Sequence, residues 1–294
     1  MIKKNIKYFN LREIMDSGQI FRMYEPENGH FIVYSADRRL ELFQDGENVT
    51  FCCDEKDFKD YWESYFDLKR DYGKIVGKAE HLSGSRGRNF IKESADYASG
   101  IRILKQDIWE MMISFIISQQ KQIPSIRKCI EGLCERFGNR HDGWYGFPTA
   151  KDIAEGGPDG LKGLSLGYRE RYIYETAVKY LADGEIPEDI LKAGYAEVKK
   201  YLCSFSGIGE KVSDCICLFG FGFIDAFPID VHIKDILWRY FMDGDKKENA
   251  KSLSYAECMR VIEENFSEFS GERGIVQQWI FAYELSCIKK EKKF

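Results

Sequence analysis

The hydrophobic pattern of this chain changes from strand-like to helix-like near residue 104, and no other feature constrains its fold as strongly. Between Phe31 and Cys53 lie short runs rich in β-branched and aromatic residues, HFIVYS, RLELFQ and NVTFCC, separated by Asp-Arg-Arg and Asp-Gly-Glu-Asn turn signals. These runs predict an antiparallel meander. Residues 57–66 carry aromatic residues at helical spacing, whereas 73–99 is polar with scattered Gly and Ser.

After residue 104 the pattern is helical throughout. Asp107 and Glu110 stand at capping-box spacing before the run IWEMMISFIISQQ, which predicts a helix start. Further helices are predicted at about 123–137, 149–155, 168–183, 188–204, 210–221, 231–242, 254–269 and 274–287. We therefore expect an α+β protein, with an N-terminal antiparallel-sheet domain at 1–104 and an all-helical domain at 105–294.

Composition excludes several classes of protein. The chain has 43 Lys and Arg against 48 Asp and Glu, a net charge of −5, which excludes a globally basic nucleic-acid coat. Its 44% hydrophobic and 31% charged residues are typical of a globular protein and exclude a disordered or collagen-like one. The longest apolar stretches, 111–117 and 215–224, are shorter than the roughly 20 residues that a membrane-spanning helix needs.

The nine cysteines are odd in number, and most lie within apolar helical patterns. The N-terminal sequence MIKKNIKYFN lacks the apolar region of a signal peptide. We therefore expect buried, reduced thiols in a cytoplasmic protein.

The segment from Tyr201 to Gly220 carries the clearest chemical signal. Gly207-Ile-Gly209 separates two helical patterns, and two glycines permit a tight hairpin whose backbone N–H groups face outward. Such a turn at a helix N-terminus can hold a phosphate without a basic side chain. A lone Gly-x-Gly is otherwise only a tight helix–helix connection.

Two charged residues follow this hairpin. Lys211 falls in the first turn of the next helix, where the helix dipole and partial burial predict a lowered pKa, and a neutral amine is a nucleophile. Asp230 precedes a new apolar pattern and is a natural N-cap, and this structural role alone would explain the residue. Its carboxylate could also accept a proton from Lys211 or stabilise positive charge on a reacting sugar.

At these residues the chain resembles the helix-hairpin-helix DNA glycosylase superfamily, and within it the 8-oxoguanine DNA glycosylase/lyase branch. The resemblance rests on SGIGEKVSDC followed by FPIDVH, and on three further ordered matches: 17–22 (SGQIFR), 166–172 (LGYRERY) and 277–281 (QQWIF). It implies a sheet domain packed on a two-part helical core, with the active-site cleft between the helical subdomains. The implied partner is double-stranded DNA containing 8-oxoguanine, and no cofactor or side-chain metal site is implied.

The resemblance also implies a mechanism. The damaged nucleotide must be flipped out, because the glycosidic bond is unreachable inside the stack. Lys211 would attack the sugar C1′, expel the base and form a Schiff base, after which β-elimination nicks the strand; Asp230 would assist. Cys215, one helical turn beyond Lys211, would lie against the flipped base, with Phe281 on the other face and Gln277 on the Watson–Crick edge.

Gly18 resembles the residue whose carbonyl accepts from the N7–H that oxidised guanine has and guanine lacks. Tyr168 and Arg169 resemble the residues that wedge into the gap, and His232 a phosphate ligand. The positions that the resemblance assigns to DNA binding are Gln120, Tyr168, Arg169, Gly207, Gly209 and His232. By the same analogy, the carbonyls of Cys203, Phe205 and Ile208 would hold a monovalent cation that bridges to phosphate.

The sequence departs from this pattern at three positions. Ser206 replaces the usual hairpin proline, which should loosen the turn slightly. Gln120 stands where eukaryotic members insert Asn, and Ser125 where they use Arg to read the opposite cytosine. We therefore expect weaker discrimination of the opposite base.

Two alternatives remain at this point, a different base-excision glycosylase on the same scaffold and a non-enzymatic DNA-binding module. An alkyl-purine glycosylase would share the Asp but usually lacks the Lys. An endonuclease-III-like enzyme would carry a four-Cys cluster near its C-terminus, but only Cys258 and Cys287 lie there, and the Cys and His spacing fits no zinc site. A non-enzymatic module would use the hairpin only to grip phosphate. A monomer is the default expectation, since one lesion needs one cleft.

Overall fold

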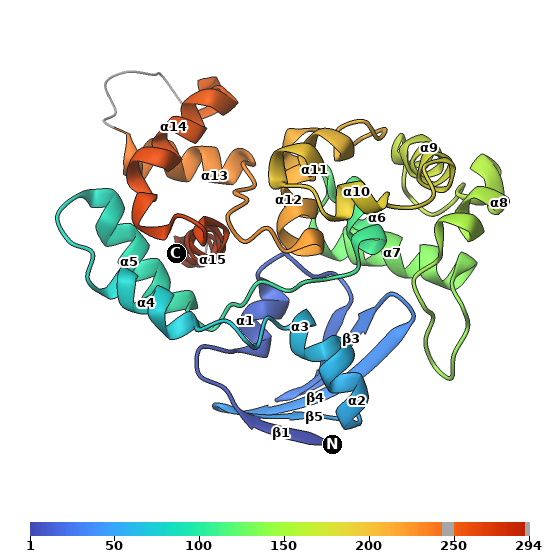
Figure 1. Ribbon diagram of the computed structural model, residues 1–294, viewed down its shortest axis with the longest axis horizontal. Helices are drawn as coiled ribbons and strands as arrows, with labels where there is room; N and C mark the ends of the chain where they lie inside the picture. The colour runs from blue at the N-terminus through green and yellow to red at the C-terminus, as the bar shows by residue number, and fades with distance from the viewer. Residues whose placement is uncertain (243–249, 292–294) are drawn as a thin grey trace.

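The computed structural model describes residues 1–242 and 250–291, and these form three lobes (Figure 1). A sheet lobe lies at the bottom of the view, and two helical lobes lie side by side above it. The predicted α+β class with a two-part helical core is confirmed. Within the described residues, no helix is long and apolar enough to cross a membrane.

The sheet lobe is built on five antiparallel strands in the order β1-β5-β4-β3-β2. Their bounds are β1 Ile2–Asn5, β2 Met23–Glu27, β3 His30–Ser35, β4 Arg38–Asp45 and β5 Asn48–Phe51. The three predicted runs form β3, β4 and β5. The sequence analysis missed β1, which has mostly exposed side chains, and β2, which contains Pro26 and a register shift.

Short helices pack on the sheet, one of them between it and the helical lobes and the others in front of its strands (Figure 1). They are α1 (Leu11–Asp16), α2 (Glu55–Asp57), a π-helical turn (Phe58–Trp62) and α3 (Glu63–Tyr65). Leu11, Ile14 and Trp62 are fully buried and share one hydrophobic cluster with the strands. Burial of the aromatic side chains between 58 and 66 explains why this run folds as predicted.

The first helical lobe contains the helices α6 Ile108–Ser118, α7 Ile123–Phe137, α8 Ala150–Gly160, α9 Arg169–Ala182, α10 Glu188–Leu191, α11 Tyr195–Leu202 and α12 Glu210–Ile216. The helix predicted at 188–204 is two helices, because Gly194 is extended and begins α11. Asp107 caps α6 as predicted by accepting from the Glu110 N–H at 2.8 Å. The Glu110 carboxylate does not close a capping box; it accepts from the Ala36 N–H of the sheet lobe at 2.6 Å.

The second helical lobe combines segments from both ends of the chain. Its helices are α4 Tyr72–Glu80, α5 Arg86–Ala98, α13 Val231–Ile236, α14 Tyr255–Asn265 and α15 Arg273–Glu291. The sequence analysis named no element at 73–99, yet α5 packs along α15 there (Figure 1). Ile75 and Ile91 belong to the helical hydrophobic cluster, whereas Leu104 belongs to that of the sheet, so the chain crosses between the lobes on both sides of the predicted boundary.

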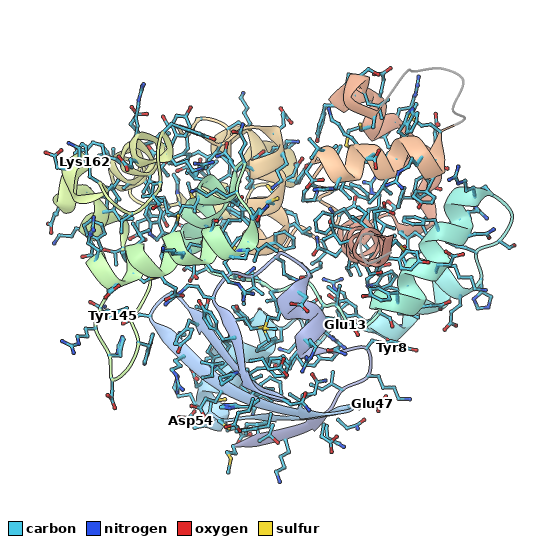
Figure 2. The ribbon with its side chains drawn as sticks, turned by 180° about the vertical axis from the view of Figure 1, so that it is seen from behind. Tyr8, Glu13, Glu47, Asp54, Tyr145 and Lys162 are labelled. Carbon is cyan, nitrogen blue, oxygen red and sulfur yellow. The ribbon has the colours of Figure 1, made fainter. Side chains whose placement is uncertain are left out.

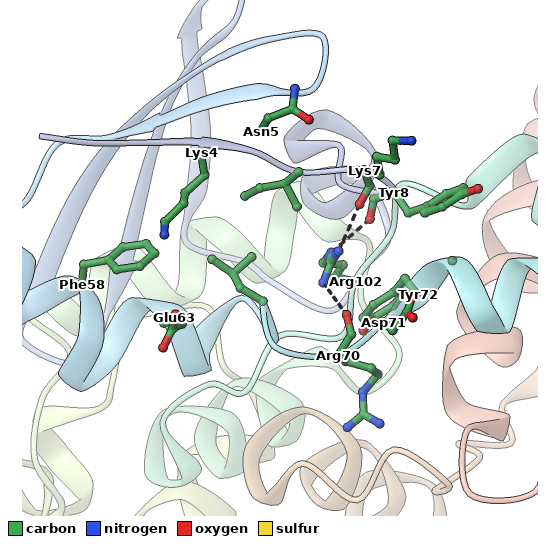
Figure 3. Close-up of a pocket in the computed structure, with 13 residues that line it drawn as sticks. Lys4, Asn5, Lys7, Tyr8, Phe58, Glu63, Arg70, Asp71, Tyr72 and Arg102 are labelled. Atoms are coloured by element: carbon green, nitrogen blue, oxygen red, sulfur yellow. Dashed lines mark hydrogen bonds between the residues drawn. The ribbon is translucent and has the colours of Figure 1, made fainter.

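Two buried arginines donate hydrogen bonds to backbone carbonyls of segments that are distant in the sequence. Arg102 donates to the carbonyls of Lys7, Tyr8, Asp67 and Arg70, which ties the exit of β1 to the loop before α4 (Figure 3). Arg22, at the end of the SGQIFR motif, donates to the Tyr145 carbonyl. Its guanidinium lies 3.8 Å from Glu110, whose pKa burial raises to about 7.

Candidate active site

The predicted hairpin joins α11 to α12 and needs a glycine at Gly207. Gly207 has φ +78°, and a Cβ there would lie 2.6 Å from Cδ2 of Tyr172. Gly209 is extended (φ −101°, ψ −172°) and begins α12 without a side-chain cap. The first-turn N–H groups of α12 are therefore available to an anion at the hairpin.

Ser206 does more than replace a proline. Its hydroxyl donates to the Glu175 carboxylate of α9 at 2.6 Å, and its carbonyl accepts from Thr176 at 3.2 Å. A proline could not make the first of these bonds. The hairpin thus gains from α9 part of the restraint that a proline would provide.

Asp230 begins α13 and is its N-cap, as predicted. Its backbone is extended (φ −100°, ψ −172°), and its carboxylate accepts from the Ile233 N–H at 2.8 Å. The cap holds the carboxylate at the start of the helix, while Pro228 restricts the chain that leads into it.

A small, half-open cavity brings most of the predicted chemistry together. Of the predicted site residues, those that line it are Gly18, Lys211, Cys215, Asp230, Gln277 and Phe281. They come from all three lobes: Gly18 from the sheet lobe, Lys211 and Cys215 from α12, and Gln277 and Phe281 from α15. The cavity measures about 60 Å³, which is small for a flipped purine, so we expect it to widen when a base enters.

The environment of Lys211 overturns one prediction. The pKa of Lys211 is raised, not lowered, because charge interaction with the Cys215 sulfur and with Asp230, and a hydrogen bond to Cys215, outweigh burial. Its Nζ also lies 5.4 Å from the Phe115 ring centroid, a contact that favours the ammonium. The helix dipole and burial disfavour the charged amine, but the groups that face it favour that form more strongly. Lys211 must therefore lose a proton before it can attack.

Cys215 is a buried thiol beside this amine. It is 3% exposed, and burial raises its pKa to about 11. A neutral thiol presents an apolar, polarisable surface to the cavity, which suits contact with the face of a base. The nine cysteines all lie within the described residues, and none of them forms a disulfide.

Family models cover most of the chain. Residues 1–112 match the model described as 8-oxoguanine DNA glycosylase, N-terminal domain. Residues 113–264 match the model of the HhH-GPD superfamily base excision DNA repair protein. The chain belongs to the HhH-GPD superfamily of base excision DNA repair proteins.

Two solved structures are similar to this HhH-GPD protein over nearly its whole length, which includes both helical lobes and the sheet. The 8-oxoguanine glycosylase/lyase of Clostridium acetobutylicum, in complex with double-stranded DNA containing cytosine opposite to 8-oxoG, is 32% identical with a TM-score of 0.85, covering 96% of this chain and 94% of that one. MBOgg1 in complex with a low-affinity DNA ligand is 31% identical with a TM-score of 0.85, covering 97% and 96%.

Among curated proteins, the N-glycosylase/DNA lyase of Saccharomyces cerevisiae is 38% identical over 170 residues, which are 52% of this HhH-GPD chain and 45% of the yeast protein. This chain spans between 45% and 64% of the length of the first three curated relatives that it matches.

The loop that carries Gly18 in this HhH-GPD protein is held firmly. Gly18 has φ +82°, and a Cβ there would lie 3.8 Å from Cε1 of Phe281. The next residue, Gln19, is fully buried; its side chain donates to the Arg102 carbonyl at 3.0 Å and accepts from the Leu104 N–H at 2.8 Å. The loop therefore presents its backbone at a fixed position on the cavity wall.

The wedge residues differ in exposure. Tyr168 is 50% exposed, as an intercalating side chain requires, but Arg169 is only 6% exposed. Arg169 donates to the carbonyls of Gln119 and Leu166, and its guanidinium lies 4.4 Å from the Tyr168 ring. In this conformation Arg169 packs beside Tyr168, and its contact with an orphaned base stays a prediction.

Gln120 and His232, two of the residues predicted to contact DNA, are both exposed. Gln120 has a left-handed backbone (φ +52°), and His232 lies 6.1 Å from the Phe281 ring, edge to face. Beside Gln120, the Gln119 amide donates to the Gly207 carbonyl at 2.9 Å and so links the wedge to the hairpin. The carbonyl site at Cys203, Phe205 and Ile208 stays a prediction.

Some cavity residues escaped the sequence analysis. They are Ser17, Phe115, Phe219, Pro228 and Gln278. Phe115 and Phe219 carry no signal beyond an ordinary apolar pattern. The adjacent Gln277 and Gln278 did carry one, because two amides in the apolar run IVQQWIF are costly to bury without partners.

Proposed function

We propose that this protein excises 8-oxoguanine from duplex DNA and nicks the resulting abasic site. The observation that supports this most strongly is the single cavity shared by Lys211, Cys215, Asp230, Gly18 and Gln277. Lys211 attacks C1′ of the flipped nucleotide, the base departs, and the amine and C1′ form a Schiff base. Asp230 provides the negative charge that stabilises the sugar cation, and β-elimination then breaks the 3′ phosphate bond.

Borohydride trapping tests this proposal. A duplex containing 8-oxoguanine should yield a covalent protein–DNA adduct with the wild-type chain and none with Lys211→Gln. Lys162→Gln is the matched control, because Lys162 is 70% exposed and lies at the outer end of the first helical lobe (Figure 2). An adduct that persists in Lys211→Gln would refute the assignment, and unchanged repair in that variant would favour a phosphate-gripping module without catalysis.

We further propose that opposite-base selection is relaxed. Ser125 is exposed in the first turn of α7, where a short hydroxyl cannot offer the donors of an arginine. Excision of 8-oxoguanine opposite cytosine and opposite adenine should then differ by less than about tenfold. A steep loss opposite adenine would contradict this.

The chain is proposed to act as a monomer in the cytoplasm, on chromosomal DNA. The cavity collects its groups from three lobes of one chain, so catalysis needs no second copy. Sedimentation of the protein with and without duplex tests the stoichiometry.

A further inference from the structure

The base cavity holds a second glutamine whose carbonyl oxygen is unpaired. Gln278 lines the cavity next to Gln277, and the two residues are 5% and 3% exposed. The Gln278 Nε2 donates to the Gln277 Oε1 at 2.8 Å. The Gln278 Oε1 is buried and has no hydrogen-bond partner among the described residues.

The hydrogen-bond network fixes the orientation of both amides. The Gln277 side chain lies 3.3 Å from the Pro228 carbonyl, and only its Nε2 can donate to an oxygen. The Gln277 Oε1 therefore faces Gln278, which must offer its own Nε2 in return. Turning either amide over would set two oxygens against each other, so the free atom of the pair has to be an acceptor.

This arrangement complements the edge of a guanine-type base. That edge presents O6, N1–H and the exocyclic N2 amino group, an acceptor followed by two donors. The second Nε2 hydrogen of Gln277 can donate to O6, and the remaining lone pair of its Oε1 can accept from N1–H. The unpaired Oε1 of Gln278 supplies an acceptor for the third.

We propose that Gln278 is a specificity-determining residue that accepts a hydrogen bond from the N2 amino group of the flipped base. This inference rests on the proposed function and deepens it. A buried acceptor that is paired only when the correct base enters rejects a base that lacks the donor, because the acceptor then stays unsatisfied. Adenine-type lesions, with an acceptor at N1 and no N2 amino group, are disfavoured on the same grounds.

The test compares two lesions that differ by one group. Duplexes carry either 8-oxoguanine or 8-oxohypoxanthine, which lacks only the N2 amino group, opposite cytosine, and single-turnover excision rates are measured. The wild-type chain should excise 8-oxoguanine at least about tenfold faster. Gln278→Met, which keeps the length of the side chain without its acceptor, should slow excision of 8-oxoguanine more than that of 8-oxohypoxanthine and bring the ratio toward one.

Both proteins are also tested by borohydride trapping on an abasic duplex, because that substrate has no base to enter the cavity. Trapping preserved in Gln278→Met together with a collapsed ratio supports the proposal. Trapping lost in parallel with excision assigns Gln278 a structural role and overturns it, as does an equal ratio in the two proteins or a wild-type ratio near one. A wild-type protein that traps the abasic site but excises neither lesion refutes the proposed substrate, and this inference falls with it.

Discussion

The starts of α12 and α13 have almost the same backbone conformation and opposite uses. Gly209 has φ −101° and ψ −172°, and Asp230 has φ −100° and ψ −172°. At α12 the first residue offers no side chain, so the amides stay open and the first turn delivers Lys211. At α13 the Asp230 carboxylate closes the same kind of helix end, and the carboxylate itself becomes the useful group.

The difference lies in the side chain of the cap and not in the backbone. A helix N-terminus concentrates unpaired N–H groups and positive potential. Without a cap it can receive a phosphate from outside, whereas with an acidic cap it holds an anion of its own. Changing the residue at either cap should therefore exchange or remove these roles.

Asp230→Asn should have the largest effect. Asn caps a helix about as well as Asp, so thermal stability should change little, while excision of 8-oxoguanine should fall by about 10²- to 10⁴-fold as the charge is lost. Asp230→Ala removes the cap as well and should cost about a further 1 kcal/mol of folding free energy. Single-turnover rates and melting curves separate the two effects; equal activity in Asp230→Asn and the wild type would show that the residue is only a cap.

Gly209→Asp should convert the start of α12 into a copy of the start of α13. A Cβ at Gly209 meets nothing within 4 Å, so the fold tolerates the change. The new carboxylate would occupy the open amides and repel phosphate, and we expect at least about tenfold weaker duplex binding with equal or higher stability. Gly209→Ala, which adds no acceptor, is the control. Fluorescence anisotropy at several salt concentrations measures both.

Gly207→Ala should act on the fold instead of on the anion site. A methyl group there would combine a φ of +78° with a 2.6 Å approach to Tyr172, and the cost should be about 1–3 kcal/mol. Denaturant unfolding checks this value. Unchanged stability would mean that the hairpin can adopt another conformation.

Cys215→Ala should produce the smallest effect, a shift in pH dependence. Below a raised pKa, the fraction of neutral Lys211 grows about tenfold per pH unit, so trapping on an abasic duplex should accelerate from pH 6 toward alkaline pH. Cys215 is the largest cause of the raised value, and the hydrogen bond that its neutral sulfur accepts from the Lys211 ammonium persists at pH values below the pKa of the thiol. Its removal lowers the pKa of Lys211, and the profile should move to lower pH; an unmoved profile would point to Asp230 and Phe115 as the controlling groups.

The sequence predicted much of this molecule, because its strongest patterns are local. Helix periodicity placed α7 and the start of α13 within a residue, and cap chemistry identified Asp107 and Asp230. The elements that it missed depend on distant partners. β1 pairs with β5, which comes much later in the sequence. The buried residues of α4 and α5 pack in the lobe that also contains α15, at the other end of the chain.

The same distinction applies to the site. Motif resemblance found Lys211, Cys215 and Gln277, and the cavity unites them. The direction of the Lys211 pKa could not be predicted, since it is set by the groups that face the amine after folding. The burial of Arg169 likewise depends on carbonyls of Gln119 and Leu166 that no local pattern reveals.

The position of Gly18 has a consequence for how such proteins diversify. The glycine enters the cavity from the sheet lobe, and the bonds of Gln19 to Arg102 and Leu104 fix it at the junction with the helical lobes. The nucleophile and its carboxylate are carried by helical segments more than 190 positions later in the chain. The contact proposed for Gly18 is thus encoded in a different stretch of the gene from Lys211 and Asp230, and exchanging that stretch between relatives should change this one part of lesion recognition while leaving the proposed cutting chemistry in place.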